Sequence, residues 1–351
     1  MEILQLPTEL LLSLPQYLHN IEDFTNLSST CRTFRRVCSD ASPNTILRLA
    51  AASSRVFFRP DPHFLIAATV RQVGEWALLS HDNTEQLRRH IQGGVYSLLH
   101  LCVDKAGLTM DDIRRLHASR FSLINPIADM IDRCAGPQFV STPDFWDGGV
   151  SNPATISLEP NRALFQIIIY GELFAPTMQA FLEPDRALPR FDQELRLDFI
   201  KYCIPDSMCR SYTGLTVLEV GPYAGTKNEL MPQKESDQVG LDYLLTCRTW
   251  REAWERVRLA IGPNFDDVSR QIMWESAVQI QGLAGLEMLR PGGLEGWRSR
   301  LAEMRKRIES LPVEKRPKES RYGSSGRYYC WESPNMAAEI TVTLAPYWGE
   351  T

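Results

Sequence analysis

The sequence predicts a mainly α-helical protein with an N-terminal three-helix unit, an irregular multi-helix domain and a small β-hairpin near the C-terminus. Apolar residues recur at intervals of three and four through most of the chain, as they do in helices with one buried face. Glycine and proline interrupt this spacing often, which indicates many short helices rather than a few long ones. No segment repeats at a period of roughly 20–50 residues, which argues against a solenoid or a propeller.

Residues 1–43 are the first predicted unit. Apolar side chains in its first part have helical spacing: Leu6, Leu10, Leu14, Tyr17 and Leu18. Pro15 lies inside this first helix, and because proline removes a backbone donor it should kink or end the helix there. We expect Asp23 to cap a second helix and Thr30 to open a third.

Residues 44–311 are predicted as the multi-helix domain. We expect Gly93-Gly94 to split one long helix, and the run from Thr109 to Asp112 to form a capping box. The apolar stretch 160–182 is typical of a buried central helix, with a break near Pro176. One predicted helix follows the capping box and includes Ile113 and Leu116. The other predicted helices are 45–54, 64–79, 84–105, 121–135, 160–182, 191–203, 241–261, 265–281 and 294–311.

Four further segments are predicted to be irregular or extended. Residues 138–158 and 222–240 have the composition of loops, and 215–220 alternates weakly, like a strand. The charged stretch 312–327 is a predicted linker. Residues 328–351 are the predicted β-hairpin and tail, because 340–344 alternates in the manner of a strand and 328–331 can pair with it.

The composition excludes several kinds of function. The net charge of −5 gives no basic excess for binding nucleic acid. The eight cysteines include no Cys-x-x-Cys pair and the histidines no His-x-x-x-His, so no metal site is expected. No phosphate-binding loop, dinucleotide fingerprint or Gly-x-Ser-x-Gly motif is present, so no catalytic residue or cofactor is predicted.

The apolar segments also bear on location. The first residues lack the cationic region of a signal peptide, and no apolar run approaches the roughly 20 residues that a membrane span needs. We therefore expect a soluble protein of a reducing compartment, cytoplasmic, nuclear or both, without a membrane partner.

Two other groups of residues have both a structural and a functional interpretation. Trp250, Trp254 and Trp274 can line a ligand pocket, but packing between helices is the favoured interpretation. The basic run Arg305-Lys306-Arg307 can act as an import signal, yet Glu309 nearby dilutes its charge and favours a solvated helix end.

The residues of the first unit resemble an F-box. The likeness runs from Leu6-Pro7-Thr8-Glu9-Leu10-Leu11-Leu12 through Tyr17-Leu18, Asp23-Phe24 and Leu27 to Thr30-Cys31-Arg32-Thr33-Phe34-Arg35. It covers about a tenth of the chain, and its parts occur in register. Residues 46–76 are also similar in style to filamentous-fungal F-box proteins whose substrate regions lack named repeats.

This resemblance implies a three-helix module that docks onto the Skp-type adaptor of a Skp–cullin–F-box ubiquitin ligase. The remainder of the chain would then hold a protein substrate, and the chain itself would not be an enzyme. The positions that the resemblance assigns to docking or its support are Leu6, Pro7, Leu10, Leu11, Leu14, Leu18, Leu27, Cys31 and Phe34. A scaffold that acts without ubiquitination, or a helical enzyme with an accidental likeness, are the alternatives.

A physical argument supports an external partner. About 40 residues in short helices bury too little surface to be stable alone. Leu10, Leu11 and Leu12 make the first helix apolar on more than one face. One face can serve the local core, and another must lie against the rest of the chain or against a second protein.

Overall fold

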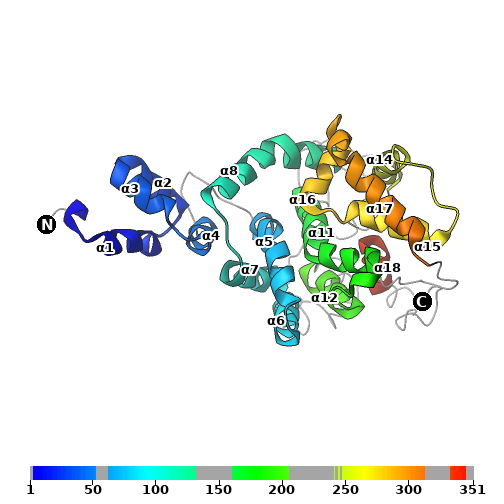
Figure 1. Cartoon of the computed structure of the whole chain (residues 1–351), viewed down its shortest axis with the longest axis horizontal. Coiled ribbons are helices and arrows are strands. Elements are labelled where there is room, and N and C mark those ends of the chain that lie inside the picture. Colours follow the sequence, from blue (N-terminus) through cyan, green and yellow to red (C-terminus); the bar gives the residue numbers. More distant parts are fainter. Residues whose placement is uncertain are drawn as a thin grey trace, which may run out of the picture.

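The computed structural model describes residues 3–52, 62–131, 160–204 and 333–344, together with 241–312 apart from 242, 243 and 246. Within these ranges every regular element is a helix, which confirms the predicted fold class (Figure 1). None of the helices within these ranges is long and apolar enough to span a membrane.

The N-terminal unit consists of three α-helices and two short 3-10 turns. Its helices are α1 (Thr8–Ser13), α2 (Ile21–Thr30) and α3 (Arg32–Ser39); the 3-10 turns are η1 (Ile3–Gln5) and η2 (Leu14–Tyr17). The prediction at Pro15 is confirmed, because α1 ends and a 3-10 turn takes over one residue before it. The cap of α2 is Asn20 rather than Asp23: its Oδ1 accepts from the Asp23 N–H at 2.9 Å.

Helix α4 (Pro43–Ala51) joins the N-terminal unit to the remaining helices. Its Arg48 Nη2 donates to the Gln16 carbonyl at 2.8 Å, on the side of the N-terminal unit. Its Asn44 Nδ2 donates to the Val103 carbonyl at 2.9 Å, at the end of α7. Leu47 and Leu49 are fully buried between the two parts. The connection is therefore a packed helix rather than an open linker.

The next helices are α5 (Pro62–Ala77), α6 (His81–Gln92), α7 (Gly94–Lys105) and α8 (Met110–Ser119). A π-turn, η3 (Arg120–Ile124), follows and the chain stays helical to residue 131. The predicted split falls at Gly94, whose φ is 80°. The predicted capping box is confirmed: the Asp112 N–H donates to Thr109 Oγ1 at 3.1 Å and the Thr109 N–H donates to Asp112 Oδ2 at 2.8 Å.

The long helix α11 (Pro160–Leu182) is the central element and packs along α5. The predicted break at Pro176 is wrong, because the helix continues through it to Leu182. Phe174 and Met178 are buried on either side of the proline, and their packing holds the helix together across the missing N–H.

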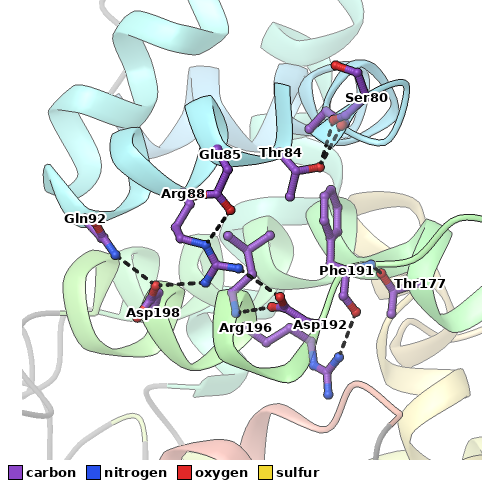
Figure 2. A network of polar contacts seen from close by, with 12 residues as sticks. Ser80, Thr84, Glu85, Arg88, Gln92, Thr177, Phe191, Asp192, Arg196 and Asp198 are labelled. Atoms are coloured by element: carbon purple, nitrogen blue, oxygen red, sulfur yellow. Dashed lines mark hydrogen bonds and ion pairs between the residues drawn. The ribbon is translucent and has the colours of Figure 1, made fainter. Parts of the chain in front are cut away.

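Helix α12 (Gln193–Cys203) follows α11 after a 3-10 turn, η4 (Pro184–Arg186), and is tied to α6 by ionic contacts. Figure 2 shows Arg88 of α6 reaching both Asp192, the cap of α12, and Asp198. Its two Nη atoms lie 2.9 Å and 3.3 Å from these carboxylates, and Gln92 donates to Asp198 at 3.1 Å. Arg88 therefore fixes how the two helices are placed.

The C-terminal helices form a second group, at the end of the molecule remote from the N-terminal unit (Figure 1). Their α-helices are α14 (Arg248–Leu259), α15 (Val268–Gln279), α16 (Gly282–Gly285) and α17 (Arg298–Ser310), and their 3-10 turns are η7 (Leu286–Leu289) and η8 (Gly293–Trp297). Trp250, Trp254 and Trp274 are at most 2% exposed, which confirms their packing role.

The predicted β-strand at 340–344 is wrong, because Met336–Leu344 is a helix, α18. Asn335 Oδ1 accepts from the Ala338 N–H at 3.0 Å and caps it. Met336, Glu339 and Ile340 are all buried, at the i, i+3, i+4 spacing of one helix face, whereas a strand would place Glu339 on the face opposite the other two. The predicted partner strand 328–331, the linker 313–327, the segments 138–158, 215–220 and 222–240, and residues 132–135 lie outside the described residues.

A glycine holds α16 against α11 at one tight point. Gly282 has a φ of 65°, and a Cβ there would overlap the Glu172 carboxylate. That carboxylate accepts from the Leu283 N–H at 2.8 Å and pairs with Arg71 Nε at 2.5 Å. The contact therefore requires a residue with no side chain.

We expect Gly282→Ala to lower the free energy of unfolding by about 2–4 kcal/mol, measured by urea denaturation, because it combines left-handed strain with displacement of Glu172. Gly292→Ala is the matched control. Gly292 has a similar φ of 77° but nothing within 4 Å of its Cβ position, so only the strain of about 1–2 kcal/mol remains. Equal losses in the two variants would contradict the role given to Glu172.

Candidate docking surface

The N-terminal unit has a small apolar core of its own. Leu11, Phe34 and Val37 are 5–7% exposed and form its centre. Four half-buried residues pack around them: Leu6, Leu14, Leu27 and Cys31. Six of the nine predicted site residues are therefore brought together here, as the inward face of α1, α2 and α3.

The other three predicted residues have different positions. Leu18 is half-buried and packs against the main core of the protein, where Ile21 and Phe24 are also buried. Pro7 is exposed before the first turn of α1, and Leu10 is 52% exposed on its surface. Among the nine, only Pro7 and Leu10 are exposed and so available for contact with a second protein.

Five large apolar side chains are exposed within the first 17 residues. They are Ile3, Leu4, Leu10, Leu12 and Tyr17, between 41% and 75% exposed, and we call this set the N-terminal apolar surface, with Leu10 and Leu12 on different sides of α1. The remaining exposed large apolar residues of the described chain are spread singly over later helices: Leu79, Tyr96, Phe121, Leu259 and Val268. The concentration at one end of the molecule is typical of an interaction site.

Four members of this surface were not among the predicted site residues: Ile3, Leu4, Leu12 and Tyr17. The run of three leucines at 10–12 contained a signal for Leu12. Successive residues of a helix point about 100° apart, so three consecutive leucines cannot share one buried face. Leu11 takes the inward position, and Leu10 and Leu12 are left on either side of it.

The N-terminal apolar surface stays clear of the rest of the chain. The principal contacts of α1 and α3 are with one another and with η2 and α2, all within the N-terminal unit. Figure 1 shows this unit projecting from one end of the molecule, with α4 between it and the other helices. Within the described residues, therefore, the exposed side of the first helix does not lie against the later helices.

Cys31 lies where α2 ends and α3 begins, and serves as the N-terminal residue of α3. The backbone N–H of Phe34 lowers the pKa of its thiol, with smaller contributions from Thr33 and Thr30. The side chain is half-buried against the inner apolar cluster. Its position is that of a packing residue at the edge of the unit's core.

The N-terminal unit combines exposed apolar side chains with exposed charged ones. Across the described residues no group of three or more histidine, cysteine or acidic side chains is placed to hold a metal ion. The exposed charged residues of the same unit include Glu9 on α1 and the arginines Arg32, Arg35 and Arg36 on α3. Apolar side chains bordered by charged ones are typical of interfaces between proteins.

One comparison with known proteins gives a match. Residues 3–43 match the family model described as F-box-like. The match begins at the first member of the N-terminal apolar surface and ends at the first residue of α4. Comparison with curated proteins and with solved structures returns no match.

Proposed function

From the F-box-like domain at residues 3–43, we propose that this protein binds the Skp-type adaptor of a cullin-based ubiquitin ligase and presents a protein substrate to it. Residues 1–43 are the adaptor-binding part, and residues 44–311 are the substrate-recognition part. The chain is a non-catalytic receptor subunit of the complex, acting in the cytoplasm, the nucleus or both.

The observation that carries this proposal is the N-terminal apolar surface. Leu10 and Leu12 are 52% and 41% exposed in the free chain, so a partner can bury a large part of each side chain. Fully burying a leucine contributes about 1.5–3 kcal/mol, and a few such anchors support a stable interface.

The predicted site residues take two roles in this proposal. Pro7 and Leu10 contact the adaptor directly, together with Ile3, Leu4, Leu12 and Tyr17. The remaining positions hold α1, α2 and α3 in the arrangement that presents them: Leu6, Leu11, Leu14, Leu18, Leu27, Cys31 and Phe34.

The mechanism that follows is proximity. A receptor of this kind makes no bond itself, and its effect on the rate comes from holding a substrate lysine near the conjugating enzyme carried elsewhere in the complex. The packed helix α4 suits this role, since Arg48 and Asn44 fasten it to the N-terminal unit and to α7.

A binding measurement with purified components tests the first half of the proposal. The full-length chain is titrated with a Skp-type adaptor in a calorimeter, and we expect a 1:1 complex at submicromolar concentration. No heat and no co-elution at tens of micromolar would refute adaptor binding.

A comparison of ubiquitination with and without the N-terminal unit distinguishes a substrate receptor from a scaffold that acts without ubiquitination. Neighbours of the chain are biotinylated by proximity labelling in cells carrying either the wild-type chain or a deletion of residues 1–43. A receptor predicts that some labelled proteins lose ubiquitin when the unit is deleted. Unchanged ubiquitination of every labelled protein would instead indicate a scaffold.

A further inference from the structure

Four buried donors without an acceptor are concentrated in one part of the molecule. Within the described residues, the buried side-chain nitrogens that have no hydrogen-bond partner all belong to α14, α15 and α17. They are Arg258 Nε, Arg270 Nε, Trp274 Nε1 and Arg305 Nη1. Buried donors are nearly always paired in folded proteins, so a local group of unpaired ones indicates a missing acceptor.

Contacts bring three of these residues together. The Arg305 guanidinium lies 4.2 Å from the Phe265 ring centroid and 6.0 Å from that of Trp274. Arg258 Nη2 lies 3.4 Å from an oxygen of Glu275, the residue next to Trp274. We call Arg258, Trp274 and Arg305 the arginine junction.

The turn after α14 completes the junction. The Gly262 N–H donates to the Arg258 carbonyl at 3.2 Å. A Cβ at Gly262 would lie only 2.9 Å from Arg305 Nε. The backbone of this turn therefore contacts the end of α14 at Arg258 and lies close to the Arg305 side chain. Arg270 flanks them, and its Nη2 donates to the Leu311 carbonyl at 2.7 Å.

The acidic partners of the junction arginines are partly exposed to solvent. Glu275 pairs with Arg258 and Glu309 with Arg305, but these carboxylates are 38% and 51% exposed and leave other guanidinium nitrogens unpaired. Burial lowers the pKa of Arg258 despite the opposing effects of Glu275 and Glu255. A further negative group would therefore be favourable at this position.

We propose that the arginine junction binds one oxyanion, a carboxylate or a phosphate group. All four unpaired atoms are donors, and an oxyanion offers only acceptors, whereas a water molecule would bring two donors of its own. Guanidinium groups bind carboxylate and phosphate oxygens in a planar, charge-assisted arrangement. The Arg305 side chain is 13% exposed, so the junction reaches solvent along the side of α17.

The junction is independent of adaptor docking. It belongs to the helices at the end of the molecule remote from the N-terminal unit (Figure 1). Failure of the test below would leave the proposed function untouched, and failure of adaptor binding would leave the junction untouched.

Thermal unfolding of the full-length chain tests the proposal. Sodium chloride is replaced by sodium phosphate, and in a second arm by sodium acetate, at constant ionic strength and pH. We expect at least one of the two anions to raise the Tm of the wild-type chain by roughly 2 °C more than that of Arg258→Met. A response to acetate identifies a carboxylate ligand, and a response to phosphate alone a phosphate ligand.

Two further variants control the comparison. Arg248→Met changes an arginine of the same helix whose side chain is 91% exposed, and it should respond as the wild type does. Arg305→Met removes the second guanidinium and replaces Arg258→Met if that variant does not fold. Phosphate also stabilises proteins by exclusion from their surface. An equal rise in the wild-type chain and the junction variants, or no rise in the wild-type chain, would overturn the proposal.

Discussion

Replacing Leu10 and Leu12 together by aspartate is expected to weaken adaptor binding by about 100-fold or more while the chain stays folded. Both side chains are 41% exposed or more, so aspartate there remains in water in the free protein. In the complex, each substitution removes an apolar anchor and buries a charge against the adaptor. Losing about 3 kcal/mol of interface energy accounts for the 100-fold change.

Two controls make this measurement specific. Asn26→Asp adds one aspartate, against two in the tested variant, at an exposed position of α2 outside the N-terminal apolar surface, and its affinity should be close to that of the wild type. Leu11→Asp places the charge in the inner cluster, where Leu11 is 5% exposed, and should unfold the unit as seen by circular dichroism. Undiminished adaptor binding by the Leu10, Leu12 variant would refute the docking surface.

Glu339→Ala is expected to lower the free energy of unfolding by about 3–5 kcal/mol, because it removes a buried carboxylate that pairs with the Arg196 guanidinium. Glu339 Oε1 lies 2.7 Å from Arg196 Nε, and Oε2 accepts from the Tyr170 hydroxyl at 2.5 Å. The side chains of Arg196 and Glu339 are 1% and 2% exposed, so water cannot replace the lost partner. Urea denaturation at neutral pH measures the loss.

The exposed pair Arg248–Glu252 provides the matched comparison. Its side chains are 91% and 49% exposed, and Glu252→Ala should cost less than about 1 kcal/mol. A second comparison replaces both buried partners by apolar residues, Arg196→Met with Glu339→Leu, and should recover much of the stability. If Glu339→Ala costs no more than Glu252→Ala, the buried pair does not hold α18 in place.

The stability conferred by Glu339 should also depend on pH. Burial raises the pKa of its carboxyl above the ordinary value of 4.5, against the opposing effects of Arg196 and Tyr170. The folded state then holds the proton more tightly than the unfolded state. The resulting stability is complete below pH 4.5 and is lost as the pH rises through the folded-state pKa.

Glu339→Gln isolates this effect because glutamine does not titrate. The free energy of unfolding of the wild type, minus that of Glu339→Gln, should fall as the pH rises from 4.5 towards 7. A difference that grows with pH would mean that Arg196 outweighs burial and lowers the pKa of Glu339.

Local patterns predicted the N-terminal unit and most helices well. Pro15 was expected to end the first helix and does, because its missing N–H removes a hydrogen bond within that turn, whereas at Pro176 packing against other helices overrides the same effect. The capping box at Thr109 and the split at Gly93-Gly94 were predicted for the same reason. In each case the deciding contact joins residues at most four positions apart.

The predictions that proved wrong depended on contacts distant in sequence. The alternation at 340–344 favoured a strand, but Glu339 and Ile340 are fixed by partners on other helices. The basic run at 305–307 favoured a solvated helix end, and Lys306 is exposed as expected, but Arg305 is 13% exposed and lies over Phe265. No spacing rule within the sequence identifies partners of this kind.

The docking positions were predictable only as a set. The resemblance to an F-box supplied the candidate residues, and the periodicity could not say which of the leucines would face inward. That choice depends on the crossing of α1 with α3, which places Leu11 against Phe34 and leaves Leu10 outside. The likeness of residues 46–76 to fungal F-box proteins stays a prediction.

Helix α4 limits how far the N-terminal unit and the later helices can move relative to one another. A flexible linker lets a bound substrate sample a wide volume and so lowers its effective concentration at any one position. Here the hydrogen bonds of Arg48 and Asn44 and the buried Leu47 clamp both ends of α4, so that its orientation belongs to the fold. Under the proposed function, helix packing would then set the distance between adaptor and substrate, and substrate lysines at one distance would be favoured over all others.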